Sequence, residues 1–293
     1  IRVTDAAGTS DLFTISQAIV AAVDAGAKII NISLGGYATG AVLDAAIGYA
    51  IQNGGLIVAA AGNDQAAQLT WPAADPRVVS VGAIDRVEQQ VSFSNSGAQL
   101  QLTAPGYGVQ TAWLDGQRVS VDGTSASAPL VAGAVAALIS QNPNLSPQQA
   151  VDLLVRSAND TGQPGADPAF GHGILNLATA LNRNNAAYID TAVSSHYYDD
   201  AKNEMQFVVQ NRGGRTVSGL TLTVNTGAAT TTQPVPSLAA GETYVVKIPV
   251  SETTLKAAGT LSFTTLLANP PGTVDAVPAN NRRSSVLTAP GNP

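Results

Sequence analysis

The sequence predicts an α/β domain, with a parallel sheet and helices on both faces, followed by a small all-β antiparallel sandwich domain. Short apolar runs alternate with helical patterns up to about residue 181, which is typical of parallel strands joined by helices. Beyond residue 190, threonine, valine and alternating polarity replace the helix-forming residues. We therefore expect two domains, at residues 1–183 and 190–293.

The first domain is expected to alternate strands and helices. Residues 1–3 predict the end of a strand, and the apolar periodicity after Asp11 predicts a helix that stops at Gly26. Ser146 and Pro147 predict the start of a later helix, as its cap and its first residue. Strands are expected at 28–34, 56–61, 78–83 and 100–104, and helices at 41–52 and 126–139.

The composition excludes several classes of function. With 293 residues, 45% hydrophobic and 12% charged, the chain is globular and long enough for one large and one small domain. The net charge of −6 argues against a nucleic-acid partner. The lack of cysteine excludes disulfides, cysteine nucleophiles and thiolate metal sites. We expect no membrane span, because no apolar run is long enough, and the richest one, around 126–139, is interrupted by polar and small residues.

Ser125 is the main candidate for a catalytic residue. It lies between Gly123-Thr124 and a run at 126–139 that is apolar at helical spacing, with Pro129 early in that run. These residues place Ser125 at the N-terminus of a buried helix, where free N–H groups and the helix dipole favour an anion. That position suits a serine whose attack on a carbonyl creates an oxyanion. Taken alone, the motif fits a capped core helix equally well.

Six further segments accompany Ser125 along the chain, at 29–36, 58–63, 72–73, 79–83, 93–94 and 104–106. In this order and spacing, the segments and Ser125 resemble the subtilisin-like serine peptidases, the subtilase family, over about residues 1–181. In that family an aspartate motif and a histidine motif precede the region where this chain begins, and neither is found in these residues.

The resemblance implies a role for each candidate residue. Ser125 is implied as the nucleophile, and Asn63 as the side-chain donor that meets the oxyanion together with the Ser125 N–H. The remaining residues would bind an extended peptide: the strand Ser33, Leu34 and Gly35, the pocket wall Ala60, Ala61 and Gly62, and the pocket floor from Thr70. Small residues there favour a pocket open to a large apolar side chain. The alternatives are a turn residue for Asn63 and ordinary core for the walls.

No base for Ser125 is evident. His172 lies in a closing glycine motif and is expected to be structural, and His196 is expected to be exposed in a linker. No metal-binding residue is predicted. One calcium site of the family would fall at Gln99 and Gln101, which are not acidic, so this site is not expected here. Calcium elsewhere is possible by the resemblance only.

The second domain carries a looser resemblance. Strands are expected at 206–210, 220–224, 243–248, 261–267 and 285–287. The segments 211–214 and 237–242, with Asn280-Asn281, resemble adhesion-type (CARDB-like) sandwich domains of bacterial secreted proteins. The resemblances imply a bacterial protein that is secreted or lies at the cell surface or in the periplasm.

Two functions fit these observations. In the first, the chain is part of a serine endopeptidase acting on proteins or peptides, and a complementary chain supplies the aspartate and the histidine. In the second, the first domain is an inactive scaffold and the sandwich binds or adheres. The retention of both Ser125 and Asn63 favours the first, and the lack of a base favours the second.

Overall fold

The computed structural model describes residues 1–289 and divides into two compact units. The first unit comprises Ile1–Arg156 and Asp167–Leu175, and the second comprises Ser157–Ala166 and the residues from Asn176 onwards. Each unit contains a hydrophobic core of its own. The chain therefore passes between the two units three times.

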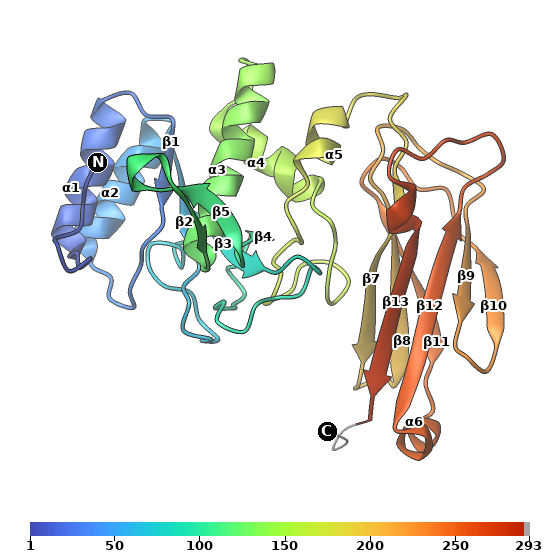
Figure 1. Ribbon diagram of the computed structural model, residues 1–293. Helices are drawn as coiled ribbons and strands as arrows, with labels where there is room; N and C mark the ends of the chain where they lie inside the picture. Colours follow the sequence, from blue (N-terminus) through green and yellow to red (C-terminus); the bar gives the residue numbers. More distant parts are fainter. Residues whose placement is uncertain (290–293) are drawn as a thin grey trace. The chain divides into compact units, whose positions relative to one another are not determined.

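A parallel sheet of four strands forms the centre of the first unit, in the order β1-β2-β3-β4 (Figure 1). The strands are β1 (Ile29–Ile32), β2 (Leu56–Ala60), β3 (Val79–Ile84) and β4 (Leu102–Pro105). Every residue of β2 and β3 is buried, which explains the continuous apolar sequence of β2, whereas β3 also buries the polar Ser80. Ile32 lies beside Ala59, so the segments that follow β1 and β2 leave the sheet at the same edge.

Helices cover both faces of this sheet. They are α1 (Leu12–Asp24), α2 (Ala41–Gln52), α3 (Thr124–Gln141) and α4 (Pro147–Arg156). Successive residues of a strand point to opposite faces, and in β2 Ile57 and Ala59 join the core formed with α1 and α2. Leu56 and Val58 are equally buried on the other face, where α3 packs across all four strands. The predicted α/β fold class is confirmed.

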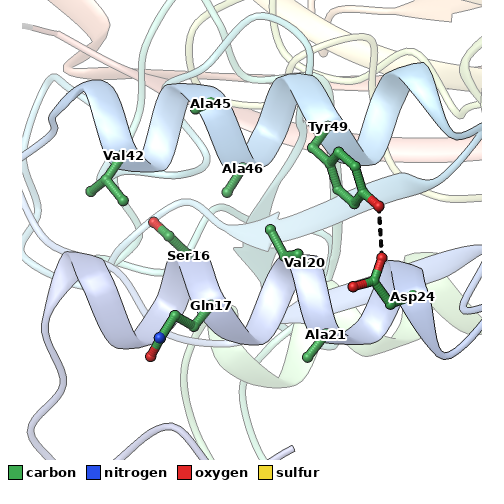
Figure 2. A pocket seen from close by; sticks show the side chains of 9 residues that line it. All are labelled: Ser16, Gln17, Val20, Ala21, Asp24, Val42, Ala45, Ala46 and Tyr49. Carbon is green, nitrogen blue, oxygen red and sulfur yellow. Dashed lines mark hydrogen bonds between the residues drawn. The ribbon is translucent and has the colours of Figure 1, made fainter.

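The helices α1 and α2 lie side by side and line an open hollow of about 690 Å³ (Figure 2). At one end of the hollow, the Tyr49 hydroxyl of α2 donates a 2.7 Å hydrogen bond to Asp24 Oδ1 of α1. This hydrogen bond to the carboxylate raises the pKa of Tyr49. None of the site residues expected from the sequence lines this hollow.

The helix α3 differs from expectation in one respect. By length and composition its 18 residues are sufficient to cross a membrane, although no such stretch was expected from the sequence. Eight of its residues are buried, and it packs against the sheet and α4. In this structure α3 is therefore the core helix of the first unit. Core helices can be as long and as apolar as helices that span a membrane.

A small hairpin precedes α3. The strands β5 (Val109–Ala112) and β6 (Arg118–Val121) pair antiparallel around the short helix η1 (Leu114–Gly116). Most of the hairpin is exposed, so it lacks the apolar pattern by which the sequence analysis found the other strands.

Two antiparallel sheets share the core of the second unit, in the orders β10-β9-β12-β13 and β11-β8-β7. Phe207 and Phe263 are its largest fully buried side chains. The strands are β7 (Thr191–Asp199), β8 (Glu204–Asn211), β9 (Thr221–Asn225), β10 (Thr230–Pro234), β11 (Thr243–Pro249), β12 (Thr260–Ala268) and β13 (Arg282–Thr288). The helices are α5 (Leu177–Asn182), α6 (Glu252–Ala258) and the short η2 (Pro278–Asn281). Of these strands, β7 and β10 were not predicted from the sequence.

The segment Ser157–Ala166 belongs to the second unit because buried polar groups hold it there. Gln210 Nε2 donates to the Ala158 carbonyl at 2.8 Å, and the Ser194 hydroxyl donates to the Asp160 carbonyl. Such long-range contacts have no signature in the local sequence. For that reason residues 157–166 were expected in the first domain.

Candidate active site

Ser125 is the second residue of α3, and its side chain is exposed. Gly123 precedes the helix with φ +139° and ψ 155°, a conformation that glycine alone adopts readily. The Ser127 hydroxyl donates to the Ala104 carbonyl at 3.0 Å and so fixes the first turn of α3 to the end of β4. The Ser125 N–H lies in that first turn, where an amide has no partner within the helix. The serine is thus rigidly placed at a helix N-terminus, as predicted.

Asn63 follows β2 and is fixed in orientation by Thr124. Its Oδ1 accepts hydrogen bonds from Thr124 N and from Thr124 Oγ1, both at 2.9 Å. Because a backbone N–H can only donate, these contacts identify Oδ1 as the acceptor and leave Nδ2 as the outward donor. A Cβ placed on Gly123 would lie 3.2 Å from Asn63 Nδ2 and 3.6 Å from Ser125 N. The two donors therefore border the same space, which suits a small anion.

The Ser125 hydroxyl has a carbonyl as its partner and not a base. Ser125 Oγ donates to the Ser33 carbonyl at 3.1 Å, and Ser33 Oγ donates to the Ser125 carbonyl at 2.8 Å. Within residues 1–289, no titratable side chain makes a hydrogen bond to Ser125 Oγ. The hydroxyl is therefore positioned but not activated by the residues described.

Neither histidine serves Ser125. His172 is exposed, and its backbone N–H donates to the Gln101 carbonyl at 2.8 Å. His196 lies in β7 and is largely buried, so the expectation of an exposed linker residue is wrong. Its ring nitrogens lie 2.7 Å from Ser285 Oγ and 2.8 Å from Thr265 Oγ1. Burial, with a smaller contribution from Arg283, lowers the pKa of His196 to about 3.

The residues expected to bind a peptide form two neighbouring segments after β1 and β2. Ser33, Leu34 and Gly35 follow β1, and Ala61 and Gly62 follow Ala60 at the end of β2. Thr70 joins the second segment, since its N–H donates to the Ala61 carbonyl at 3.0 Å. The structure therefore brings the expected strand, wall and floor together next to Ser125.

Asn95 supports these segments and was not found from the sequence. It is fully buried, its N–H donates to the Gly62 carbonyl at 3.0 Å, and its Nδ2 donates to the Ala61 carbonyl at 3.3 Å. Its Oδ1 accepts from Asp64 N and Ala66 N at 2.9 and 3.0 Å. Asn95 thus fixes the backbone on both sides of Asn63. The only sequence signal was an asparagine directly after Phe93-Ser94.

Tyr37 and Asp64 connect the two segments at their far ends. The Tyr37 hydroxyl donates to Asp64 Oδ2 at 2.7 Å and accepts from Asn95 Nδ2 at 3.2 Å. The hydrogen bond to the carboxylate is the main reason that the pKa of Tyr37 is raised. Asp64 is exposed, and its carboxylate is bound by the Tyr37 hydroxyl.

The residues at the calcium position implied by the resemblance do not fit that ion. The Gln99 carbonyl accepts from Ser80 Oγ at 2.7 Å, and the Gln101 carbonyl accepts from His172 N at 2.8 Å. Both side chains are amides and carry no charge to balance the cation. Across the part of the chain that the structure describes, no group of three His, Cys, Asp or Glu side chains is placed to hold a metal.

Known proteins are similar to this chain over residues 1–173. The model of the Subtilase family (Peptidase_S8) matches residues 1–173. Subtilisin Savinase of Lederbergia lenta is 34% identical over 180 residues, which is 61% of this chain and 66% of that protein. The cell wall-associated protease of Bacillus subtilis (strain 168) is 38% identical over 205 residues, 62% of this chain and 23% of that protein. The chain therefore spans less than two thirds of the length of these relatives.

Solved structures show the same likeness. The patellamide maturation protease PatA superposes with a TM-score of 0.56 at 33% identity, over 61% of this chain and 70% of that one. A lanthipeptide protease gives a TM-score of 0.57 at 29% identity, over 61% of this chain and 68% of that one.

Proposed function

Because the chain belongs to the subtilase family, we propose that it supplies the nucleophile and the oxyanion donors of a serine endopeptidase, and that a complementary polypeptide supplies the aspartate and the histidine. The observation that carries this proposal is the geometry at the start of α3. Ser125 is exposed beside two donors, Asn63 Nδ2 and its own N–H, yet its hydroxyl is bound to the Ser33 carbonyl.

The reaction would proceed in four steps. A peptide pairs with Ser33, Leu34 and Gly35 as an added strand, in the binding mode that supplies main-chain hydrogen bonds. The partner's histidine removes the Ser125 proton, and Oγ leaves the Ser33 carbonyl to attack the scissile carbonyl carbon. Asn63 Nδ2 and the Ser125 N–H stabilise the negative charge on the carbonyl oxygen. The amine leaves with that proton, and water hydrolyses the acyl-enzyme.

The outer edge of β1 supports a place for the complementary polypeptide. β1 ends the four-stranded sheet, and Ile29 and Ile30 are only partly buried although β2 and β3 are buried completely. A hollow of about 390 Å³ lies along this strand and is lined largely by apolar side chains of α1, β1 and the first residues. Strands of parallel sheets are normally covered, so an exposed parallel edge with an apolar flank favours the addition of a further strand.

The proposed location is outside the cytoplasm of a bacterium, secreted or at the cell surface. The likeness to a protein named cell wall-associated protease supports it. The second unit, proposed as an adhesion-type domain, would then bind the substrate, the partner or a surface.

A labelling experiment tests the peptidase proposal. The partner would be taken from an upstream stretch or a neighbouring reading frame that encodes an Asp-Ser/Thr-Gly and a His-Gly-Thr-His pattern. A fluorophosphonate is added to this chain alone, to the mixture with the partner, and to a mixture that contains Ser125→Ala. We expect covalent labelling of Ser125 in the wild-type mixture only. An unlabelled Ser125 in a complex that has formed would refute the proposal.

The second candidate is an inactive scaffold that binds through its second unit. The bond from Ser125 Oγ to the Ser33 carbonyl favours it, because a serine held by a carbonyl is not activated. In that case Ser125→Ala would leave every binding activity unchanged and no partner would produce labelling.

A further inference from the structure

The strand β10 forms one edge of the sheet β10-β9-β12-β13 in the second unit (Figure 1). Thr230, Thr231, Thr232 and Pro234 are exposed, so within residues 1–289 this edge is open to solvent. An open edge presents unpaired N–H and C=O groups, which form a template for a further strand. β10 is therefore a candidate for pairing with another chain.

Hydrogen bonds at both ends of the β9–β10 pair show which backbone groups face outwards. Just before β10, the Thr226 N–H donates to the Ala229 carbonyl at 2.9 Å. Just after β10, the Val235 N–H donates to the Leu220 carbonyl at 2.9 Å, in the same register. Hydrogen-bonded and non-hydrogen-bonded positions alternate along an antiparallel pair. Counted from Ala229 to Val235, every second residue therefore bonds to β9.

Thr231 and Gln233 are the residues of β10 that bond to β9 by this alternation. Thr230 and Thr232 lie between those positions, so their N–H and C=O groups point away from the sheet. Pro234 has the same orientation but no N–H to donate. The open edge thus offers two complete sets of donor and acceptor, at Thr230 and Thr232.

The other three edge strands of the second unit each have a feature that opposes such pairing. The pairing register of β7 shifts between Val193 and Ser195, as at a bulge. Arg283 of β13 donates to the Ser194 carbonyl of β7 at 2.8 Å, so these two edges are joined to each other. β11 carries Lys247, a charged side chain of the kind that protects natural edges.

The surroundings of β10 favour a second copy of this chain as the added strand. The net charge is −6, but residues 216–241 contain no charged residue, so two copies can meet here without like-charge repulsion. A two-fold axis at Thr231 places Thr230 of one copy opposite Thr232 of the other, on both sides of the axis. Both residues of each pair have outward-facing groups, so each pair exchanges two hydrogen bonds. The edge is thus complementary to itself.

We propose that β10 pairs with β10 of a second copy in this antiparallel register, so that two four-stranded sheets join into one continuous sheet. The contact is isologous and short, so the dimer forms reversibly as the protein concentration rises. This pairing does not depend on the proposed peptidase function, because Ser125 and Asn63 lie in the first unit.

Sedimentation velocity of the full chain at increasing concentrations measures the dimer. Thr232→Pro removes an N–H that makes no bond to β9, and Thr232→Lys places like charges diagonally across the axis. We expect a concentration-dependent dimer in the wild type, with a dissociation constant at least about tenfold higher in both variants. Thr264→Lys is the matched control, because Thr264 is exposed on the same face but lies in the inner strand β12. Its dissociation constant should equal that of the wild type.

A cysteine cross-link tests the register. The chain contains no cysteine, so a single substitution introduces one thiol per copy. Thr231→Cys places the two thiols opposite each other in a non-hydrogen-bonded pair, where the Cβ atoms approach closely enough for a disulfide. After oxidation with diamide we expect a covalent dimer from Thr231→Cys and none from Thr264→Cys.

A wild-type chain that remains monomeric at every concentration would overturn the proposal. A dimer with an unchanged dissociation constant in Thr232→Lys would also overturn it, because another surface would then hold the two copies together. Thr232→Lys decides the matter even if Thr232→Pro does not fold. A dimer in which Thr231→Cys cannot be cross-linked would exclude the proposed pairing of β10 with itself.

Discussion

Ser125 and His196 have the two reactive side-chain types of a serine peptidase, but their surroundings are opposite. Ser125 is exposed at a helix N-terminus in the first unit, next to donors that have room for a further acceptor. His196 is largely buried in the second unit, between Ser285 and Thr265, with the Phe207 ring edge-on at 4.8 Å. One site has unused hydrogen-bonding capacity and the other has none left.

Because of this difference, the region around Ser125 can bind and react with a further group, whereas His196 can only stabilise the fold of the second unit. The Thr265 hydroxyl also lies 3.3 Å from the Arg283 carbonyl, to which it donates, so it accepts from His196 Nε2–H. Nδ1 then accepts from the Ser285 hydroxyl, and the ring is fully satisfied in its neutral form. At the start of α3, in contrast, Thr124 satisfies only the oxygen of Asn63 and leaves its NH2 group available.

The largest effect is expected from removing the available donor of Asn63. Asn63→Ala removes Nδ2, and Asn63→Asp removes it but keeps an acceptor for Thr124. In the complemented enzyme we expect kcat to fall by about 10²–10³-fold in both variants, which is the known cost of losing such a donor in a subtilisin. Steady-state kinetics on a peptide substrate measure the change.

Asn53→Ala is the matched control, because Asn53 is also exposed and follows α2 outside the site. Its kcat should equal that of the wild type. If Asn63→Asp retained full activity, the oxyanion would have to be stabilised by other groups, and the assignment of Asn63 would be wrong.

The second prediction concerns His196, whose two ring nitrogens both have hydrogen-bond partners. The unfolded chain binds a proton at His196 near pH 6.5, whereas the folded chain does so only near pH 3. Protons therefore favour the unfolded state between these two pH values. The contribution of neutral His196 to the free energy of unfolding is present above pH 6.5 and is lost as the pH falls towards 3. Between pH 6.5 and 4.5 we expect a loss of about 2 kcal/mol from this residue.

Amide hydrogen exchange at Phe207 in β8 measures this loss as a change in protection. His196→Gln should remove the corresponding part of the pH dependence. His172→Gln serves as control, because His172 is exposed and lies in the first unit, and it should leave the pH dependence unchanged. Equal pH dependence in wild type and His196→Gln would show that the buried ring contributes nothing to acid sensitivity.

The sequence was sufficient for features determined locally. The alternation of apolar runs predicted β2 and β3, and the residues from Gly123 to Pro129 predicted that Ser125 begins a helix. It was insufficient where distant residues decide. His196 is buried because β7 pairs with β8, and Asn95 reaches the segment after β2 through hydrogen bonds to Ala61 and Gly62. These arrangements depend on tertiary contacts, which no local pattern of hydrophobicity records.

The last prediction compares two glycines of the first unit, Gly123 and Gly133. Gly123→Ala should destabilise the first unit by about 1–3 kcal/mol, because φ +139° with ψ 155° is strained for any residue with a Cβ. The same Cβ would intrude on the space next to Asn63 Nδ2 and lower peptidase activity.

Gly133→Ala is the matched control. Gly133 lies on the exposed side of α3, where a Cβ would meet nothing within 4 Å, so this variant should instead stabilise the first unit by about 0.5–1 kcal/mol. Denaturant unfolding followed by tryptophan fluorescence reports on this unit, because Trp71 and Trp113 both lie in it. Stabilisation by Gly123→Ala, of the same sign as that by Gly133→Ala, would show that the backbone at Gly123 is not strained by a Cβ.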